Sequence, residues 1–424
     1  MKLKFAIFTF ALSPFLNAQT PTVAPNAAPV EAVKVAPTPA PAPAPASVSA
    51  SASAPAATPV VPTAACVAPT ITLQAQYLTD AARLMAGYDT SAAGPFAALS
   101  ASPAITAHKQ NFAAAWQKLD ARQLDLVKAF GNAEVVPHVG NAPLFYPFSG
   151  PDFLYASALF PNASSYVLTG LEPVGAVPEI EKFKPEELNA SLADLRKSLH
   201  AILSFSFFKT IDMKVDFKRS RFQGVVPVLM TFAAKSGYDV TSASFFVLHT
   251  DGSKCITDAA NLLKVPAGTI PGVTLALKKM DSSATTSVTY MSSDIGDGGI
   301  VKTPQYETLV RALKPGATFI KSASFLMHKS YFSKIRSLIL EVSPIVLQDD
   351  SGIPYKNFDL NLWQPKFYGA YFRPIPLFAN FNQPNLTAAY KQLGATPLAF
   401  AIGYRSSKTN SSLLLMTRKA ATAK

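Results

Sequence analysis

Apolar positions between residues 70 and 130 recur at steps of three and four. This spacing places them on one face of a helix. Residues that carry the pattern are Tyr77, Ala81, Leu84, Met85, Phe112, Trp116, Leu119, Leu124, Val127 and Phe130. We therefore expect residues 66–135 to form an N-terminal helical segment, with Gly131 ending its last helix.

Strand-like and helix-like patterns alternate from residue 136 onward. An apolar run ends in the turn Ser149-Gly150-Pro151-Asp152, a helical pattern covers 153–159, and a second β-rich run ends at Glu172. This order predicts a βαβ unit with parallel strands. Residues 136–424 are thus expected to form an α/β domain whose mostly parallel sheet carries helices on both faces.

The remaining elements follow from the same two periods. Helices are predicted over 185–208, 224–236, 305–313 and 332–342, and strands over 240–249, 272–280, 285–292, 318–324, 345–347, 398–405 and 411–416. The runs 272–280 and 285–292 are joined by Asp281-Ser282-Ser283, which predicts an antiparallel hairpin. Additional antiparallel strands are therefore expected beside the parallel ones.

The first 18 residues have the three parts of a secretory signal. Lys2 and Lys4 precede an apolar stretch over 5–16, and Asn17-Ala18 supplies a small residue at the cleavage site. The stretch is too short for a permanent membrane anchor. A buried N-terminal helix is the alternative. We expect an exported protein, periplasmic or extracellular, with no transmembrane anchor after cleavage.

Residues 19–65 are rich in proline and alanine and contain no aromatic residue. Proline fixes φ and removes a backbone donor, so polyproline II is favoured over helix or strand. This composition predicts a disordered, semi-rigid spacer. It is either a tether that holds the domain away from a surface or a passive leader.

The formal net charge is +12, which favours acidic partners. Only 15% of the residues are charged, and the densest basic patch, at 209–221, is diluted by Asp212 and Asp216. A solvated surface is therefore a better interpretation of that patch than a nucleic-acid site. An anionic envelope component is the expected partner, no nucleic acid is expected, and the oligomeric state is left open.

Two cysteines, Cys66 and Cys255, are present. Two thiolates cannot make a four-cysteine metal site, and no metal is predicted. An oxidising compartment would allow them to form a disulfide that pins the N-terminal edge to the domain. Two buried free thiols are the alternative.

The segment from 140 to 330, apart from an interruption over 209–280, resembles the core of class I S-adenosylmethionine-dependent methyltransferases. The resemblance rests on the turn at 145–152, on Glu172, on the Asp294 loop and on Leu313-Lys314-Pro315-Gly316 before a strand. It implies a Rossmann-like sheet and a cofactor held by Ser149, Gly150, Asp152, Glu172 and Asp294. The turn has one glycine, and Pro151 removes a donor, which departs from the family's glycine-rich pattern. The cofactor is accordingly left unknown.

The whole chain also resembles an uncharacterised bacterial family of secreted proteins. The shared segments are Tyr-Pro-Phe-Ser-Gly-Pro-Asp, Gly-Leu-Glu-Pro and Asp-Asp-Ser-Gly-Ile-Pro-Tyr. No activity follows from this resemblance.

Four polar residues near predicted strand ends are candidates for catalysis. Lys321 and His328 could act as electrophile and base, and Asp349 and Asp350 as general acid–base groups. Asp-Gly turns and a satisfied histidine are the structural alternatives. The sequence contains no Gly-x-Ser-x-Gly, phosphate-loop or His-Glu-x-x-His motif.

The sequence therefore predicts an exported α/β protein of unassigned activity that binds a ligand or partner without catalysis. One alternative is an enzyme with a methyltransferase-like core and a pocket near Asp152 and Glu172. The other is an electrostatic binder of anionic envelope polymers.

Overall fold

The computed structural model describes residues 73–205, 222–405 and 408–420. The chain divides into a unit over 1–61 and a compact unit over 62–424, and all described residues belong to the second. The predicted signal peptide and tether, Cys66 and the basic patch at 209–221 lie outside the described residues.

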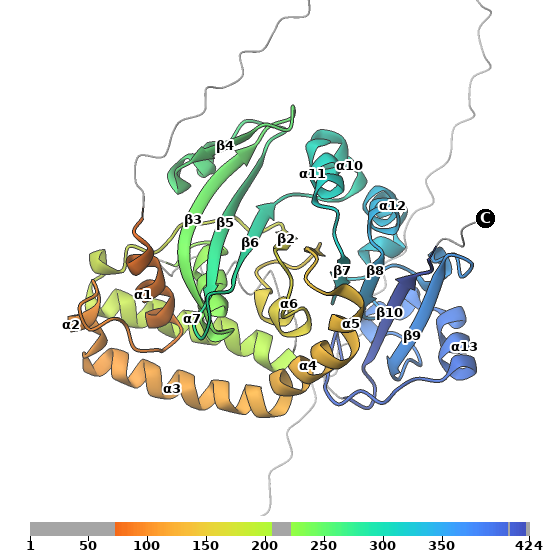
Figure 1. The fold of residues 1–424 in the computed structure, drawn as a ribbon, viewed down its shortest axis with the longest axis horizontal. Helices are drawn as coiled ribbons and strands as arrows, with labels where there is room; N and C mark the ends of the chain where they lie inside the picture. The colour runs from red at the N-terminus through yellow and green to blue at the C-terminus, as the bar shows by residue number, and fades with distance from the viewer. Residues whose placement is uncertain (1–72, 206–221, 406–407, 421–424) are drawn as a thin grey trace, which may run out of the picture. The chain divides into compact units, whose positions relative to one another are not determined.

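The compact unit is built on one mixed sheet of ten strands in the order β4-β3-β5-β6-β2-β1-β7-β8-β10-β9 (Figure 1). The strands are β1 Leu144–Tyr146, β2 Tyr166–Gly170, β3 Tyr238–Leu248, β4 Lys254–Thr257, β5 Ile270–Lys279, β6 Thr285–Ser292, β7 Ala317–Ile320, β8 Ile345–Gln348, β9 Trp363–Gly369 and β10 Ser412–Arg418.

The prediction of a mostly parallel sheet is wrong for the sheet as a whole. The five neighbours β6, β2, β1, β7 and β8 run parallel. All five remaining pairs are antiparallel and lie at the two ends of the sheet. The predicted β5–β6 hairpin is confirmed, with Lys278 opposite Thr285.

Two strands, β4 and β9, were not predicted, and each has a local reason. β4 has only four residues. β9 contains Pro365, which argues against a strand except at an edge, and β9 is indeed an edge strand. The predicted strand over 398–405 does not form, and the prediction over 411–416 corresponds to β10, which pairs with β8 and β9.

Helices lie on both sides of the sheet (Figure 1). They are α1 Ala75–Met85, α2 Ala97–Ser100, α3 Pro103–Leu119, α4 Asp125–Phe130, α5 Val136–Val139, α6 Phe153–Leu159, α7 Pro185–Phe205, α9 Val226–Lys235, α10 Asp297–Lys302, α11 Gln305–Leu313, α12 Ser333–Val342 and α13 Pro384–Leu393. None of the described helices is long and apolar enough to cross a membrane.

Alternation along the central strands separates two hydrophobic cores. In β1, Leu144 and Tyr146 join the core that α1, α6 and α9 cover, whereas Phe145 joins the core that α11 and α12 cover. In β7, Phe319 and Ile320 divide in the same way. Successive strand residues face opposite sides, so a sheet buried on both faces supplies both cores.

Gly131 does not end a helix, which corrects the prediction. The chain stays helical through a π-helical turn, Gly131–Val135, and α5, and it ends at Gly140, whose φ is 61°. A Cβ on Gly131 would lie 2.6 Å from the carbonyl oxygen of Ala158 in α6. The glycine therefore serves close packing between helices rather than termination.

Candidate functional site

The predicted site residues lie after the carboxyl ends of the five parallel strands. Ser149, Gly150 and Asp152 follow β1, Glu172 follows β2, Asp294 follows β6, Lys321 and His328 follow β7, and Asp349 and Asp350 follow β8. Parallel strands end at one edge of a sheet, which is where open α/β sheets bind ligands.

Asp152 and Lys321 form a buried ion pair between the β1 turn and the end of β7. Lys321 Nζ lies 2.7 Å from Asp152 Oδ2, with the side chains 2% and 1% exposed. The same Oδ2 accepts a hydrogen bond from the Tyr146 hydroxyl at 3.0 Å. Oδ1 accepts one from the amide of Tyr155 at 3.2 Å and so caps α6.

The ammonium group of Lys321 lies among protein groups and is shielded from solvent. Burial lowers the pKa of the Lys321 ammonium, and the carboxylates of Asp152 and Asp349 oppose that shift. Its Nζ also lies 3.6 Å from the ring centroid of Tyr155, a cation–π contact. Burial raises the pKa of Tyr146 well above its usual value, and Asp152 adds to that effect. This ion pair joins two strands rather than presenting charge to solvent.

The backbone donors of the β1 turn bond within the protein. The amides of Ser149 and Gly150 both donate to the Thr169 carbonyl of β2, at 2.9 and 3.3 Å. Pro151 has no amide hydrogen. The amides of Asp152 and Phe153 donate to Ser149 and Pro151. A turn that binds an anionic group needs amides directed at the ligand, and in this turn they are occupied.

Glu172 is buried at the end of β2. The Tyr290 hydroxyl donates to it and lies 2.9 Å from its carbonyl oxygen and 3.2 Å from Oε2. A Cβ on Gly170 would lie 2.3 Å from Glu172 Oε2 and 3.0 Å from Gly150 Cα. The β1 turn therefore packs directly onto the end of β2, around the Glu172 carboxyl group.

The loop after β7 contains three non-glycine residues with left-handed backbone. They are Ser322, Ser324 and Phe325, with φ between 50° and 53°. Such strain persists only where the surroundings hold it. It explains why β7 ends at Ile320 and does not reach Ser324 as predicted.

Three consecutive amides of this loop are held by side chains from elsewhere. The amide of Ser322 donates to Asp349 Oδ2 at 2.7 Å, that of Ala323 to Ser351 Oγ at 2.7 Å, and that of Ser324 to the Tyr404 hydroxyl at 2.8 Å. Such a row of amides is a common anion-binding feature. Here the Asp349 carboxylate and two hydroxyl groups of the same chain fill it.

Asp349 and Asp350 are coupled acids at the end of β8. Burial raises the pKa of Asp349, although three donors from Ser322 and Ser351 oppose the shift. Burial, and then the Asp349 charge, raises the pKa of Asp350 to about 7. We assign the charge to Asp349, because its hydrogen bonds favour the ionised form, and the shared proton to Asp350.

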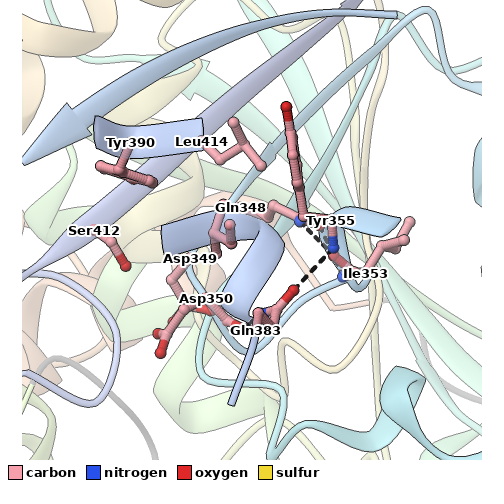
Figure 2. Close-up of a pocket in the computed structure, with 10 residues that line it drawn as sticks. Gln348, Asp349, Asp350, Ile353, Tyr355, Gln383, Tyr390, Ser412 and Leu414 are labelled. Carbon is pink, nitrogen blue, oxygen red and sulfur yellow. Dashed lines mark hydrogen bonds between the residues drawn. The ribbon is translucent and has the colours of Figure 1, made fainter. Parts of the chain in front are cut away.

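A small cavity lies beside these acids between β8, β10 and α13 (Figure 2). Its volume is about 10 Å³, which is room for about one water molecule. Gln383 and Gln348 line it, and their amides bond to the backbone of Tyr355, Asp350 and Ile353. The cavity is too small for a substrate. None of the predicted site residues lines the larger hollow of about 300 Å³ beside β9.

His328 lies beside this network and packs among aromatic rings. Its ring centroid lies 5.1 Å from that of Phe325 and 5.6 Å from that of Phe381. Burial, and then the charges of Lys356 and Arg336, lower its pKa to about 4. The imidazole is neutral at pH 7, and Nε2 is buried without a partner among the described residues.

Asp294 forms a local turn on the exposed side of the loop after β6. Its Oδ1 accepts a hydrogen bond from the amide of Gly296 at 2.9 Å. This is the turn-forming use of aspartate. Neighbouring Ser293 is buried, and its Oγ has no partner among the described residues.

Sequence reasoning missed Tyr146, Ser351 and Tyr404 as members of the site. The Tyr404 hydroxyl contacts two residues of the β7 loop. It accepts a hydrogen bond from the Ser324 amide and donates one to the Ser322 carbonyl at 2.6 Å. Tyr146 belongs to the segment Tyr-Pro-Phe-Ser-Gly-Pro-Asp, and Ser351 belongs to the segment Asp-Asp-Ser-Gly-Ile-Pro-Tyr. Tyr404 comes from a segment that was predicted as a strand, so no local signal indicated it.

Comparison with known proteins gives no relative. No family model matches the chain, and neither a curated protein nor a solved structure matches it significantly. Within the described residues, no cluster of three or more His, Cys, Asp or Glu side chains could hold a metal ion.

Proposed function

We propose that this chain is an exported α/β protein that acts by binding a partner, on a Rossmann-like scaffold whose ligand edge has become structural. The strand order supports the scaffold. Numbered along the chain, the five parallel strands lie in the order 3-2-1-4-5, that of the first five strands of a Rossmann sheet. Antiparallel strands extend this order at both ends.

One observation carries the proposal: the protein's own groups occupy the donors and charges at the ligand edge. The β1 turn directs its amides to Thr169, the β7 loop directs three amides to internal acceptors, and Lys321 is neutralised by Asp152. A cofactor at this edge would have to break several of these bonds. Each broken hydrogen bond would leave a buried polar group unpaired, at about 1–3 kcal/mol.

Calorimetric titration of the mature chain with S-adenosylmethionine tests the proposal against the methyltransferase-like alternative. We expect no saturable heat up to about 1 mM ligand, because even a millimolar complex represents about 4 kcal/mol of binding energy. The matched variant is Glu172→Gln, which changes the acid that the resemblance implies for the ribose.

Saturable heat that disappears in Glu172→Gln would overturn the binding-only proposal and establish a cofactor site. Export is tested separately by sequencing the N-terminus of protein recovered from the cell envelope or the medium. We expect it to begin at Gln19, after the predicted signal peptide.

A further inference from the structure

We propose that a surface of aromatic rings and cations beside the β7 loop binds an acidic polysaccharide. This inference rests on the proposed function, since it names the partner of a non-catalytic exported protein. We call it the aromatic–cationic surface. Its members are Phe325, Phe372, Phe378, Phe381 and Tyr404, with Lys356, Arg373 and Arg405.

The rings form one cluster although they come from three distant segments. Phe325 stacks on Phe381, with ring centroids 5.4 Å apart and planes 9° apart, and it contacts Phe378 at 4.9 Å. Phe378 also contacts Tyr404 at 4.9 Å. Phe325 is buried, whereas Phe378, Phe381 and Tyr404 are half-buried and so form the outer layer.

Two exposed apolar side chains adjoin members of this surface along the chain, Phe372 beside Arg373 and Leu377 beside Phe378. Phe372 is 68% exposed and Leu377, which precedes Phe378, is 79% exposed. Exposed apolar groups that adjoin one another indicate a binding surface more than scattered ones do. The flat C–H face of a sugar ring fits against an aromatic ring, and a residue such as Phe372 loses little conformational freedom on binding.

Cations lie near the same rings, since Arg405 follows Tyr404 and Lys356 is near His328, which packs against Phe325 and Phe381. The guanidinium of Arg405 donates to the carbonyl oxygen of Arg373, and Lys356 is close enough to His328 to lower the pKa of its imidazole. Lys356 and Arg373 are exposed. Burial raises the pKa of Tyr404, and two acids, Asp349 and Asp350, are near enough to raise it further. Burial also raises the pKa of Asp350 to about 7. The surface therefore has an excess of positive charge, in a chain of net charge +12.

Charge and rings together favour an acidic polysaccharide over other polyanions. A simple polyanion would use the cations but gain nothing from the rings. Single-stranded nucleic acid would use both, but the predicted export signal favours a partner of the cell envelope over nucleic acid. Sugar carboxylates would pair with Lys356 and Arg373 while the ring faces pack on the aromatic side chains.

Binding of the mature chain to immobilised polygalacturonate tests this proposal. We expect retention at low salt that weakens as salt rises. Phe372→Ala and the double variant Lys356→Gln/Arg373→Gln should each weaken binding by roughly tenfold, since exposed charge pairs and stacked rings contribute modestly but add up over several contacts. Neutral dextran should not bind.

Matched controls change exposed residues at the opposite end of the sheet. Leu263→Ala controls for Phe372→Ala, and Lys264→Gln/Lys278→Gln controls for the double cation variant. Both controls should bind as the unchanged chain does.

The proposal fails if polyglutamate or single-stranded DNA binds as tightly as polygalacturonate, or if the control variants lose as much affinity as the surface variants. In those cases the proposed binding function survives with another partner or surface. A cofactor heat in the S-adenosylmethionine titration would instead contradict the proposed function itself, so the two failures are distinguishable.

Discussion

At the scale of single residues, Asp152 is a predicted ligand group whose observed partners all belong to the protein itself. One carboxylate accepts from the Tyr146 hydroxyl and the Tyr155 amide and pairs with Lys321. Taking two charges out of water is costly, and the cost is recovered only when every remaining hydrogen-bonding position is used. The free energy of unfolding should therefore fall strongly when one partner is removed and much less when both are replaced.

Removing one member of this pair should destabilise the protein strongly. We expect Lys321→Met to lower the free energy of unfolding by about 3–5 kcal/mol, because it leaves the Asp152 charge buried and uncompensated. Asp152→Asn/Lys321→Met should recover much of that loss. Urea unfolding of the three proteins measures it.

The half-buried pair Arg83–Asp239, which is more accessible to solvent, provides the control. Its atoms lie 2.9 Å apart, but its side chains are 31% and 22% exposed. Arg83→Met should cost less than about 1 kcal/mol. Equal costs for Arg83→Met and Lys321→Met would contradict a special role for the buried pair.

Asp350 should make stability depend on pH in the direction opposite to an ordinary paired carboxylate. Its pKa is about 7 in the folded chain and about 4 when unfolded. The folded state therefore holds a proton that the unfolded state releases, and stability falls as pH rises from about 4 to 7. Asp350→Asn should raise the unfolding free energy at pH 8 by about 1–2 kcal/mol after allowance for solvent screening.

The measurement is thermal unfolding of both proteins at pH 5 and pH 8. His328, with its pKa lowered to about 4, acts oppositely and loses stability as pH falls below about 6.5, which is why the variant is compared with its parent at each pH. No change in the difference between the two proteins across this range would contradict the assignment.

At the scale of elements, packing overrides the local signals that end a helix or a strand. Gly131 lies inside a helical run because α6 passes so close to it. β7 ends early because Asp349, Ser351 and Tyr404 accept hydrogen bonds from the amides of residues 322–324. In both cases the deciding partner is distant in sequence.

Gly131→Ala should therefore destabilise the protein despite the higher helix propensity of alanine. Alanine in place of a helical glycine gains about 1 kcal/mol, but the new Cβ would lie 2.6 Å from the Ala158 carbonyl oxygen. We expect a net loss of about 1–3 kcal/mol from this overpacking.

Gly298→Ala is the matched control. Gly298 lies in the helix α10 and is exposed, and a Cβ there would meet nothing within 4 Å. This variant should keep the propensity gain and unfold at a slightly higher temperature. A stabilised Gly131→Ala protein would contradict the packing argument.

At the scale of the whole molecule, the predicted Cys66–Cys255 disulfide would tie the start of the compact unit to the sheet. Cys255 is buried in β4, and Cys66 lies outside the described residues, so the pairing stays a prediction. Alkylation of the unfolded mature chain should label neither thiol before reduction and both afterwards.

Loss of this bridge should also lower stability. Cys66→Ser/Cys255→Ser should unfold more easily by up to about 4 kcal/mol, because a long closed loop restricts the unfolded chain. Labelling of both thiols without reduction would contradict the bridge and favour two free thiols.

The local elements could be predicted from the order of residues alone. The helices at 153–159 and 305–313 and the hairpin of β5 and β6 were predicted because the period of apolar residues is a property of each segment alone. The sequence also placed the polar candidates after strand ends, since turns are polar and follow strands.

Which of those residues meet depends on how the distant segments fold together. Asp152 and Lys321, or Ser324 and Tyr404, are joined across stretches of chain that no local pattern spans. The antiparallel ends of the sheet were likewise set by which strands come together, not by the apolar period of each. Local periodicity depends on neighbours in sequence, whereas a site depends on neighbours in space.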